Sequence, residues 1–171
     1  MRYFSGFCFH GEEGLFAPFL AQNDFNVAGF SYGAIKAFEY TLHAMHRIDT
    51  LQLFSPAFFQ DHDERFKKLQ MRAFIANNAR YTQNFMQNIM YNLTVDLTPY
   101  TKGETQEALS ELLYYTWDAN KLHILKERGV RIEVYLGEQD RIINPLSVKE
   151  FFVPYATVYY FKNVGHLLKA Y

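Results

Sequence analysis

The sequence contains a single cysteine, Cys8, so no disulfide can form within the chain, and no cysteine and histidine spacing suggests a zinc site. No stretch approaches the ~18 uninterrupted apolar residues that a membrane span needs. The apolar start, Arg2 to Phe9, is too short for the hydrophobic region of a signal peptide, and charged residues follow it. We therefore expect a cytoplasmic protein with no metal site and no membrane partner.

An excess of charge of one sign is also missing, because 17 lysine and arginine residues face 18 aspartate and glutamate residues. No global field favours nucleic acid, so a charged partner must be met by a local patch. Phenylalanine and tyrosine are abundant, with 17 and 13 residues, which suits a protein that lines an apolar pocket with few residues. The length of 171 residues predicts one globular domain over 1–171.

Five short segments have the composition of β-strands, and helical segments alternate with them. This alternation is typical of an α/β fold with a parallel sheet. The strand candidates are Tyr3–Phe9, Phe25–Phe30, Thr50–Phe54, Arg131–Leu136 and Ala156–Phe161. The helix candidates are Phe16–Ala21, Tyr32–His46, Lys121–Arg128 and Pro145–Phe152.

The order of these elements predicts a sheet with two unlike faces. Parallel crossovers are nearly always right-handed, so five strands in sequence order place every crossover helix on one face. The polar residues Asn26, Gln52 and Glu133 alternate with apolar ones, unlike strands that are buried on both faces. We expect one semi-polar, tyrosine-bearing face, either exposed or used in self-association, unless the short helix over 16–21 covers it.

The middle of the chain, residues 56–117, has no convincing strand, and its apolar residues recur at helical spacing. We interpret this segment as a helical lid inserted after the third strand. Phe66, Leu69 and Ala73 share a helix face, and this apolar face is expected to cover a pocket.

A second face of the same helix is basic, because Arg65, Lys68 and Arg72 fall on it at helical spacing. We expect this face to point outward, where it could bind an acidic partner. The alternative is a solvated basic face that is balanced by the acidic residues within 61–64.

Gly29-Phe30-Ser31-Tyr32-Gly33 lies where a strand candidate turns directly into a helix, and we call this turn the elbow. A serine on such a turn is held in a strained conformation in which it can reach a carbonyl group, and the glycines leave room for neighbouring backbone. Ser31 is therefore the candidate nucleophile. The alternative is a glycine-rich tight turn whose serine only caps a helix.

A serine nucleophile needs a base and a group that holds the base. Among six histidines, His166 follows the fifth strand on a loop at its carboxyl end, where sites of α/β proteins form, whereas His10 ends the first strand and shapes its loop. Asp140 follows the fourth strand in the same way and falls between serine and histidine in the chain. Asp61 is the rival acid. Structural roles remain open for both, as a loop histidine and as a turn or capping aspartate.

An oxyanion hole needs two backbone N–H groups that point at the developing negative oxygen. We expect the first from Tyr32, directly after the nucleophile. The second is expected from the loop His10-Gly11-Glu12-Glu13-Gly14 after the first strand, at the N–H of Glu12.

These motifs together resemble the α/β-hydrolase family across most of the chain outside the insertion. The residues that match are His10-Gly11, Gly29 to Gly33, Gly137 to Asp140 and Gly165-His166. Two further stretches are similar to the compact, BioV-type pimeloyl-acyl-carrier-protein methyl ester esterases of biotin synthesis: His10 to Phe16, and the short build with Met1 to Phe7 and Gly29 to Ala37. The usual antiparallel opening strands and one strand–helix unit before the elbow are absent.

The resemblance implies a reduced α/β-hydrolase fold of about five parallel strands and a serine carboxylesterase without a cofactor. It also implies a substrate, the methyl ester of a pimeloyl chain on acyl-carrier protein, with release of methanol. Acyl-carrier proteins are acidic, so Arg65, Lys68 and Arg72 would bind and orient the carrier. A thioesterase or general short-chain esterase with the same triad is one alternative. An inactive hydrolase-fold interaction module is another.

Overall fold

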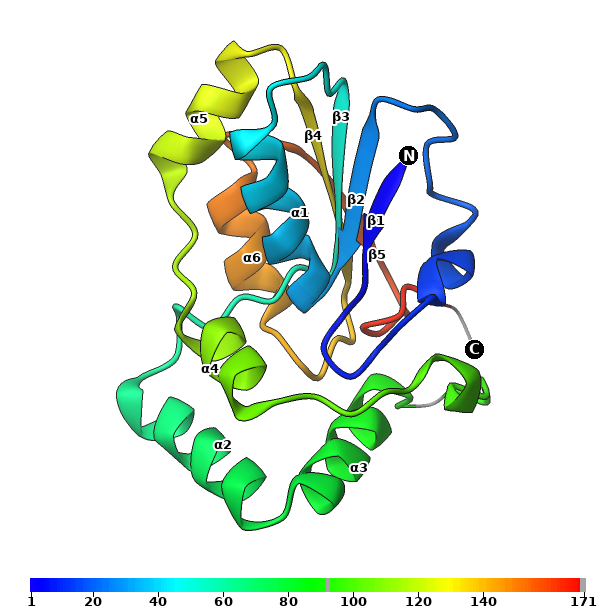
Figure 1. Ribbon diagram of the computed structural model, residues 1–171, viewed down its shortest axis with the longest axis vertical. Coiled ribbons are helices and arrows are strands. Elements are labelled where there is room, and N and C mark those ends of the chain that lie inside the picture. Colours follow the sequence, from blue (N-terminus) through cyan, green and yellow to red (C-terminus); the bar gives the residue numbers. More distant parts are fainter. Residues whose placement is uncertain (92, 170–171) are drawn as a thin grey trace.

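A single five-stranded parallel sheet forms the centre of the protein (Figure 1). The computed structural model describes residues 1–91 and 93–169. The strands lie in sequence order: β1 (Arg2–Phe4), β2 (Asn26–Phe30), β3 (Thr50–Phe54), β4 (Arg131–Gly137) and β5 (Thr157–Phe161). Every neighbouring pair is parallel. The predicted α/β class with five parallel strands is therefore confirmed.

Three helices cover one face of this sheet (Figure 1). They are α1 (Tyr32–His43), α5 (Ala119–Glu127) and α6 (Pro145–Phe152). Their placement follows from right-handed crossovers between strands that lie in sequence order. The helix starts agree with local capping chemistry, since the Asn144 side chain accepts from the N–H groups of Leu146 and Ser147 at the start of α6.

Among the described residues the opposite face carries no α-helix, only the short 3₁₀ helix over 12–16, whose Phe16 stacks on Phe54, and the face is semi-polar as predicted. Gln52 is buried there and donates to Glu133 and to Tyr135, both at 2.9 Å. The aromatic ring of Phe19 packs on Tyr135 and covers part of this network. Tyr159 stacks on Tyr135 and remains 39% exposed. The polar residues are therefore paired with one another, while a tyrosine reaches the surface. Self-association through this face stays a prediction.

The first strand and the first helix differ from the prediction. β1 ends at Phe4, and Phe7, Cys8 and Phe9 are fully buried in a loop instead of continuing the strand. Cys8 has a positive φ of 64°, which interrupts the extended conformation. In place of a helix over 16–21 the chain forms the 3₁₀ helix η1 (Glu12–Phe16). Apolar composition alone did not distinguish a buried loop from a strand.

The insertion contains α2 (Glu64–Ala76), α3 (Asn78–Ile89), the 3₁₀ helix η2 (Thr98–Tyr100) and α4 (Gln106–Tyr114). In its described residues it has no strand, only a bridge between Thr101 and Phe9. These helices lie at the end of the sheet where the strands end (Figure 1). No helix in the described part of the chain is long and apolar enough to cross a membrane.

Candidate active site

Ser31 lies between β2 and α1 with a positive φ of 53°, a conformation that costs energy for a residue with a side chain. A Cβ atom at Gly29 would collide with the carbonyl of Gly33, and one at Gly33 would collide with the carbonyl of Phe4. Two hydrogen bonds hold the turn: Ser31 N donates to Phe54 O at 2.9 Å, and Ala57 N donates to Ser31 O at 3.1 Å. The turn is therefore fixed from both sides, and its two glycines are required by close packing.

His166 and Asp140 form a buried pair, with 2.6 Å between Nδ1 and Oδ2 and no exposure of either side chain. The other carboxylate oxygen, Oδ1, accepts from the N–H groups of Ile142 at 2.7 Å and Ile143 at 3.2 Å. Both oxygens of Asp140 are thus engaged, and the aspartate can only hold the ring in one orientation. A hydrogen bond from Nδ1–H to this carboxylate leaves Nε2 as the basic nitrogen.

The imidazole ring of His166 packs beside the turn that carries Ser31. The rings of His166 and Phe30, the residue before Ser31, are 5.0 Å apart between centroids. The Ser55 hydroxyl donates to the His166 carbonyl at 2.8 Å and fixes the backbone of the loop. Nε2 is buried and has no hydrogen-bond partner within residues 1–91 and 93–169. A buried imidazole nitrogen without a partner is unusual, and an incoming hydroxyl or substrate would supply one.

The rival residues are placed elsewhere. The exposed Asp61 lies 3.7 Å from His62, and the His62 ring stacks on Phe66 of the lid. His43 and His123 pair with glutamates on their own helices. The structure thus brings His166 and Asp140 together, as expected from the sequence, and gives Asp61 a different partner.

The loop that was expected to supply the second oxyanion donor has another arrangement. The Glu12 side chain is fully buried and accepts from Gly6 N–H at 2.9 Å and from the Tyr3 hydroxyl at 3.2 Å. Burial, and then the charge of Glu12, raise the pKa of Tyr3 far above its ordinary range, so the hydroxyl stays a donor. The Glu12 carboxylate therefore holds the loop after β1, and the role of the Glu12 N–H as an oxyanion donor stays a prediction.

The residues directly after β1 lie beside the turn that carries Ser31. Phe4 pairs with Gly29, and the Cα of Gly6 lies against the Phe30 ring and carbonyl. The next N–H, that of Phe7, donates to no described residue. We expect this N–H to complete the oxyanion hole beside that of Tyr32. The signal was present in the sequence as Ser5-Gly6-Phe7 directly after the strand.

A cavity of about 350 Å³ lies under the lid and reaches the loop after Asp140. Aromatic, aliphatic and amide side chains from α2, α3 and α4 form most of its wall. They are Phe66, Gln70, Ala73, Tyr81, Asn84, Phe85, Asn88, Leu112 and Leu113, and Phe59, which precedes α2, joins them. Arg141 and Ile142, which directly follow Asp140, close it on one side. Phe66 and Ala73 face this cavity as predicted. Leu69 does not, because it is 52% exposed.

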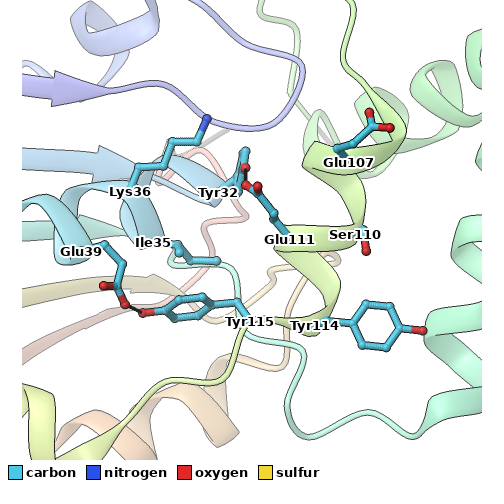
Figure 2. A pocket seen from close by; sticks show the side chains of 9 residues that line it. All are labelled: Tyr32, Ile35, Lys36, Glu39, Glu107, Ser110, Glu111, Tyr114 and Tyr115. Carbon is cyan, nitrogen blue, oxygen red and sulfur yellow. Dashed lines mark hydrogen bonds between the residues drawn. The ribbon is translucent and has the colours of Figure 1, made fainter.

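A wider groove of about 660 Å³ separates α1 from α4 (Figure 2). The hydroxyl of Tyr32 donates to Glu111 of α4, and that of Tyr115 donates in return to Glu39 of α1 at 2.5 Å. Lys121 also donates to Glu39, at 3.0 Å. None of Ser31, Asp140 and His166 lines this groove. These reciprocal bonds dock the lid on α1, the helix that follows Ser31.

Within the described residues, no group of three or more histidine, cysteine, aspartate or glutamate side chains could hold a metal ion.

No protein-family model matches the sequence, and no curated protein matches it. Solved structures do match. MenH from S. aureus is 12% identical with a TM-score of 0.61, over 96% of this chain and 85% of that one. BioG from Haemophilus influenzae is 11% identical with a TM-score of 0.61, over 98% and 88%.

Larger esterases match the same core. Naproxen esterase from Bacillus subtilis is 19% identical with a TM-score of 0.57, over 84% of this chain and 53% of that one. A carboxylesterase from Nitrososphaera gargenis is 14% identical with a TM-score of 0.55, over 82% of this chain and 57% of that one. This chain thus covers only about half of these enzymes. From its sheet, its elbow and these neighbours, the chain has a reduced α/β-hydrolase fold with a helical lid inserted after β3.

Proposed function

We propose that this chain is a serine ester hydrolase in which Ser31 is the nucleophile, His166 the general base and Asp140 its orienting acid. The observation that carries the proposal is the buried pair of His166 and Asp140, 2.6 Å apart, with Nε2 unpartnered and the imidazole ring packed on Phe30, the residue before the strained Ser31. The esterases among the similar structures support the reaction class through the fold.

The proposed reaction follows from this geometry. Ser31 Oγ attacks the ester carbonyl while its proton passes to Nε2 of His166, and Asp140 stabilises the resulting imidazolium. The N–H groups of Tyr32 and Phe7 receive the negative oxygen at the start of α1, where the helix dipole favours negative charge. Collapse of the intermediate expels the alcohol, which takes the proton from Nε2. Water, activated by the same nitrogen, then releases the acid.

The proposed substrate is the methyl ester of a pimeloyl chain on acyl-carrier protein, as in biotin synthesis. The sequence resemblance of the loop and the elbow carries this choice, and two structural features support it. The cavity under the lid is mainly apolar, as an acyl chain requires. Arg65, Lys68 and Arg72 are exposed on the outer side of α2, where an acidic carrier could bind.

Thioester cleavage is the main enzymatic alternative, because the same three residues serve both reactions. An interaction module without activity is the alternative of another class. The strain at Ser31 and the burial of an ionisable pair both argue against the module, since each costs stability without a structural return.

Incubation with pimeloyl-carrier-protein methyl ester, followed by mass spectrometry of the intact carrier, separates these functions. We expect the carrier to keep its acyl chain and lose only the ester methyl group, with the Ser31→Ala protein inactive. Release of the whole acyl chain would identify a thioesterase. An unchanged carrier would contradict the proposed substrate. If the protein also hydrolysed no small ester, the interaction module would be the remaining function.

A further inference from the structure

Arg141 is the only charged side chain among the described residues that line the cavity under the lid. The rest of the wall is apolar or amide in character and contains no carboxylate. Burial raises the pKa of Tyr81, the one phenol in the wall, to about 12, so this group is also neutral near pH 7. The cavity therefore has a positive site and nothing in its wall to balance it.

The position of Arg141 is fixed by its neighbours. It directly follows Asp140, and the next residue, Ile142, donates its N–H to the Asp140 carboxylate at 2.7 Å. The Arg141 guanidinium lies over the face of the Tyr91 ring, a cation–π arrangement that orients the group. It has no carboxylate partner within residues 1–91 and 93–169.

Two amide side chains lie at the same cavity. Asn84 and Asn88 are one helical turn apart on α3, so they share a face, and both line the cavity and are exposed at its rim. Amide N–H groups are hydrogen-bond donors, and a guanidinium presents its donors in a planar fork that matches a carboxylate or a phosphate. The donors needed for an anion thus come from two elements, α3 and the loop after β4.

We propose that Arg141, with Asn84 and Asn88, forms an anion-binding site at the cavity, which takes an acyl ligand that carries a carboxylate or a phosphate. That the ligand carries an acyl chain rests on the proposed function. That it carries an anion rests on the charge of the cavity wall alone. The anion could be the carboxylate that ester hydrolysis leaves on the acyl chain, or the phosphate of the carrier's prosthetic arm. In both cases the site would select charged acyl ligands over neutral ones of equal length.

Binding to the Ser31→Ala protein tests the site without hydrolysis. We would titrate a nitrobenzofurazan-labelled hexanoic acid and its methyl ester, a pair that differs in one charge, and follow the fluorescence. Arg141→Gln should weaken binding of the acid by about tenfold and leave the ester within about twofold, as for loss of a charged hydrogen bond. Arg141→Lys should keep part of the affinity, because it retains the charge but not the fork.

A second arm identifies the source of the anion. Phosphopantetheine and pantetheine would each be tested as competitors of the labelled acid. Stronger competition by phosphopantetheine, lost in Arg141→Gln, would identify the phosphate of the carrier's arm as the anion. Arg80→Gln, which removes one exposed charge from α3, is the matched control and should leave the affinity for both ligands unchanged. Equal affinity of the unmutated site for charged and neutral ligands in both arms would overturn the proposal. Failure of hydrolysis in the wild-type protein would count against the proposed function alone.

Discussion

At the scale of single residues, the identity of the acid is the sharpest question. Ser31→Ala and His166→Ala should each lower kcat by roughly 10⁴–10⁶, as triad losses do. Asp140→Asn should be severe as well, because Asp140 holds the imidazole through a 2.6 Å bond. Asp61→Asn is the matched control and should be nearly silent. Steady-state kinetics on a p-nitrophenyl ester measure all four, and a crippling Asp61→Asn with a silent Asp140→Asn would contradict the assignment.

Cys8 offers a prediction of reactivity and pH dependence. Its side chain is fully buried, and burial raises the pKa of the thiol to about 11. We expect no alkylation by iodoacetamide at about pH 8 in the native protein and rapid alkylation in denaturant. The raised pKa also stabilises the fold below the ordinary thiol pKa of about 8.5, and this contribution is lost as the pH rises toward 11. Labelling of native protein at the denatured rate would show that the loop after β1 is open.

The strand-to-helix turn at Ser31 and the pairing of His166 with Asp140 could be predicted because these residues follow strand ends in a fixed order. It did not predict the role of Glu12, whose buried carboxylate binds Gly6 and Tyr3. From sequence alone, a glutamate in a glycine-rich loop is expected to be exposed, because its hydrogen-bond partners are not known. The same loop hides Phe7, because a backbone N–H leaves no trace in residue type.

At the scale of elements, the outer face of α2 is tested by charge. Replacing Lys68 and Arg72 by glutamate should lower kcat/KM for the carrier-bound ester and weaken its dependence on salt, because these side chains are exposed. Hydrolysis of a small p-nitrophenyl ester should stay unchanged. The exposed Lys126 and Lys149, on α5 and α6, provide a control with the same change of charge. Equal losses on both substrates would mean that the α2 charges only support the fold.

The docking of the lid is tested at the groove between α1 and α4 (Figure 2). Burial tends to raise the pKa of Glu39, but hydrogen bonds from Tyr115 and Lys121 outweigh it and lower the pKa. This pairing therefore stabilises the protein above the ordinary carboxyl pKa of about 4.3 and is lost as the pH falls through the lower value.

Tyr115→Phe should consequently lower the free energy of unfolding by about 1 kcal/mol at neutral pH, and by less in acid. Tyr114→Phe is the matched control, since Tyr114 is exposed. Denaturant unfolding at two pH values measures the difference. An equal effect of both substitutions, or none that depends on pH, would contradict the reciprocal docking.

The helices and strands themselves were predictable to different degrees. β3 and α6 match their predicted bounds, because a short apolar run and an Asn-Pro start are strong local signals. Leu69 was assigned to the pocket by helical spacing alone, yet it is 52% exposed. Spacing places it at the edge of the apolar face, and only the packing of α2 against α4 decides on which side it falls.

At the scale of the whole molecule, strand order and crossover handedness were sufficient to predict a sheet with one helical face. They could not show what covers the other face. That cover is the segment from η1 to Phe19: Phe16 stacks on Phe54, Phe19 packs on Tyr135, and the Phe19 carbonyl accepts from the buried Gln52 at 2.9 Å. Long-range contacts of this kind leave no periodic pattern in the sequence.

The central claim is that Ser31 is an activated nucleophile. Labelling of the folded protein with a fluorophosphonate probe, followed by peptide mass spectrometry, tests it most directly, because such probes react with serines that a neighbouring base activates. The account predicts one adduct, on Ser31, which is lost in Ser31→Ala, strongly reduced in His166→Ala and absent after denaturation. A protein that stays unlabelled, or that is labelled equally well after His166→Ala, would contradict it.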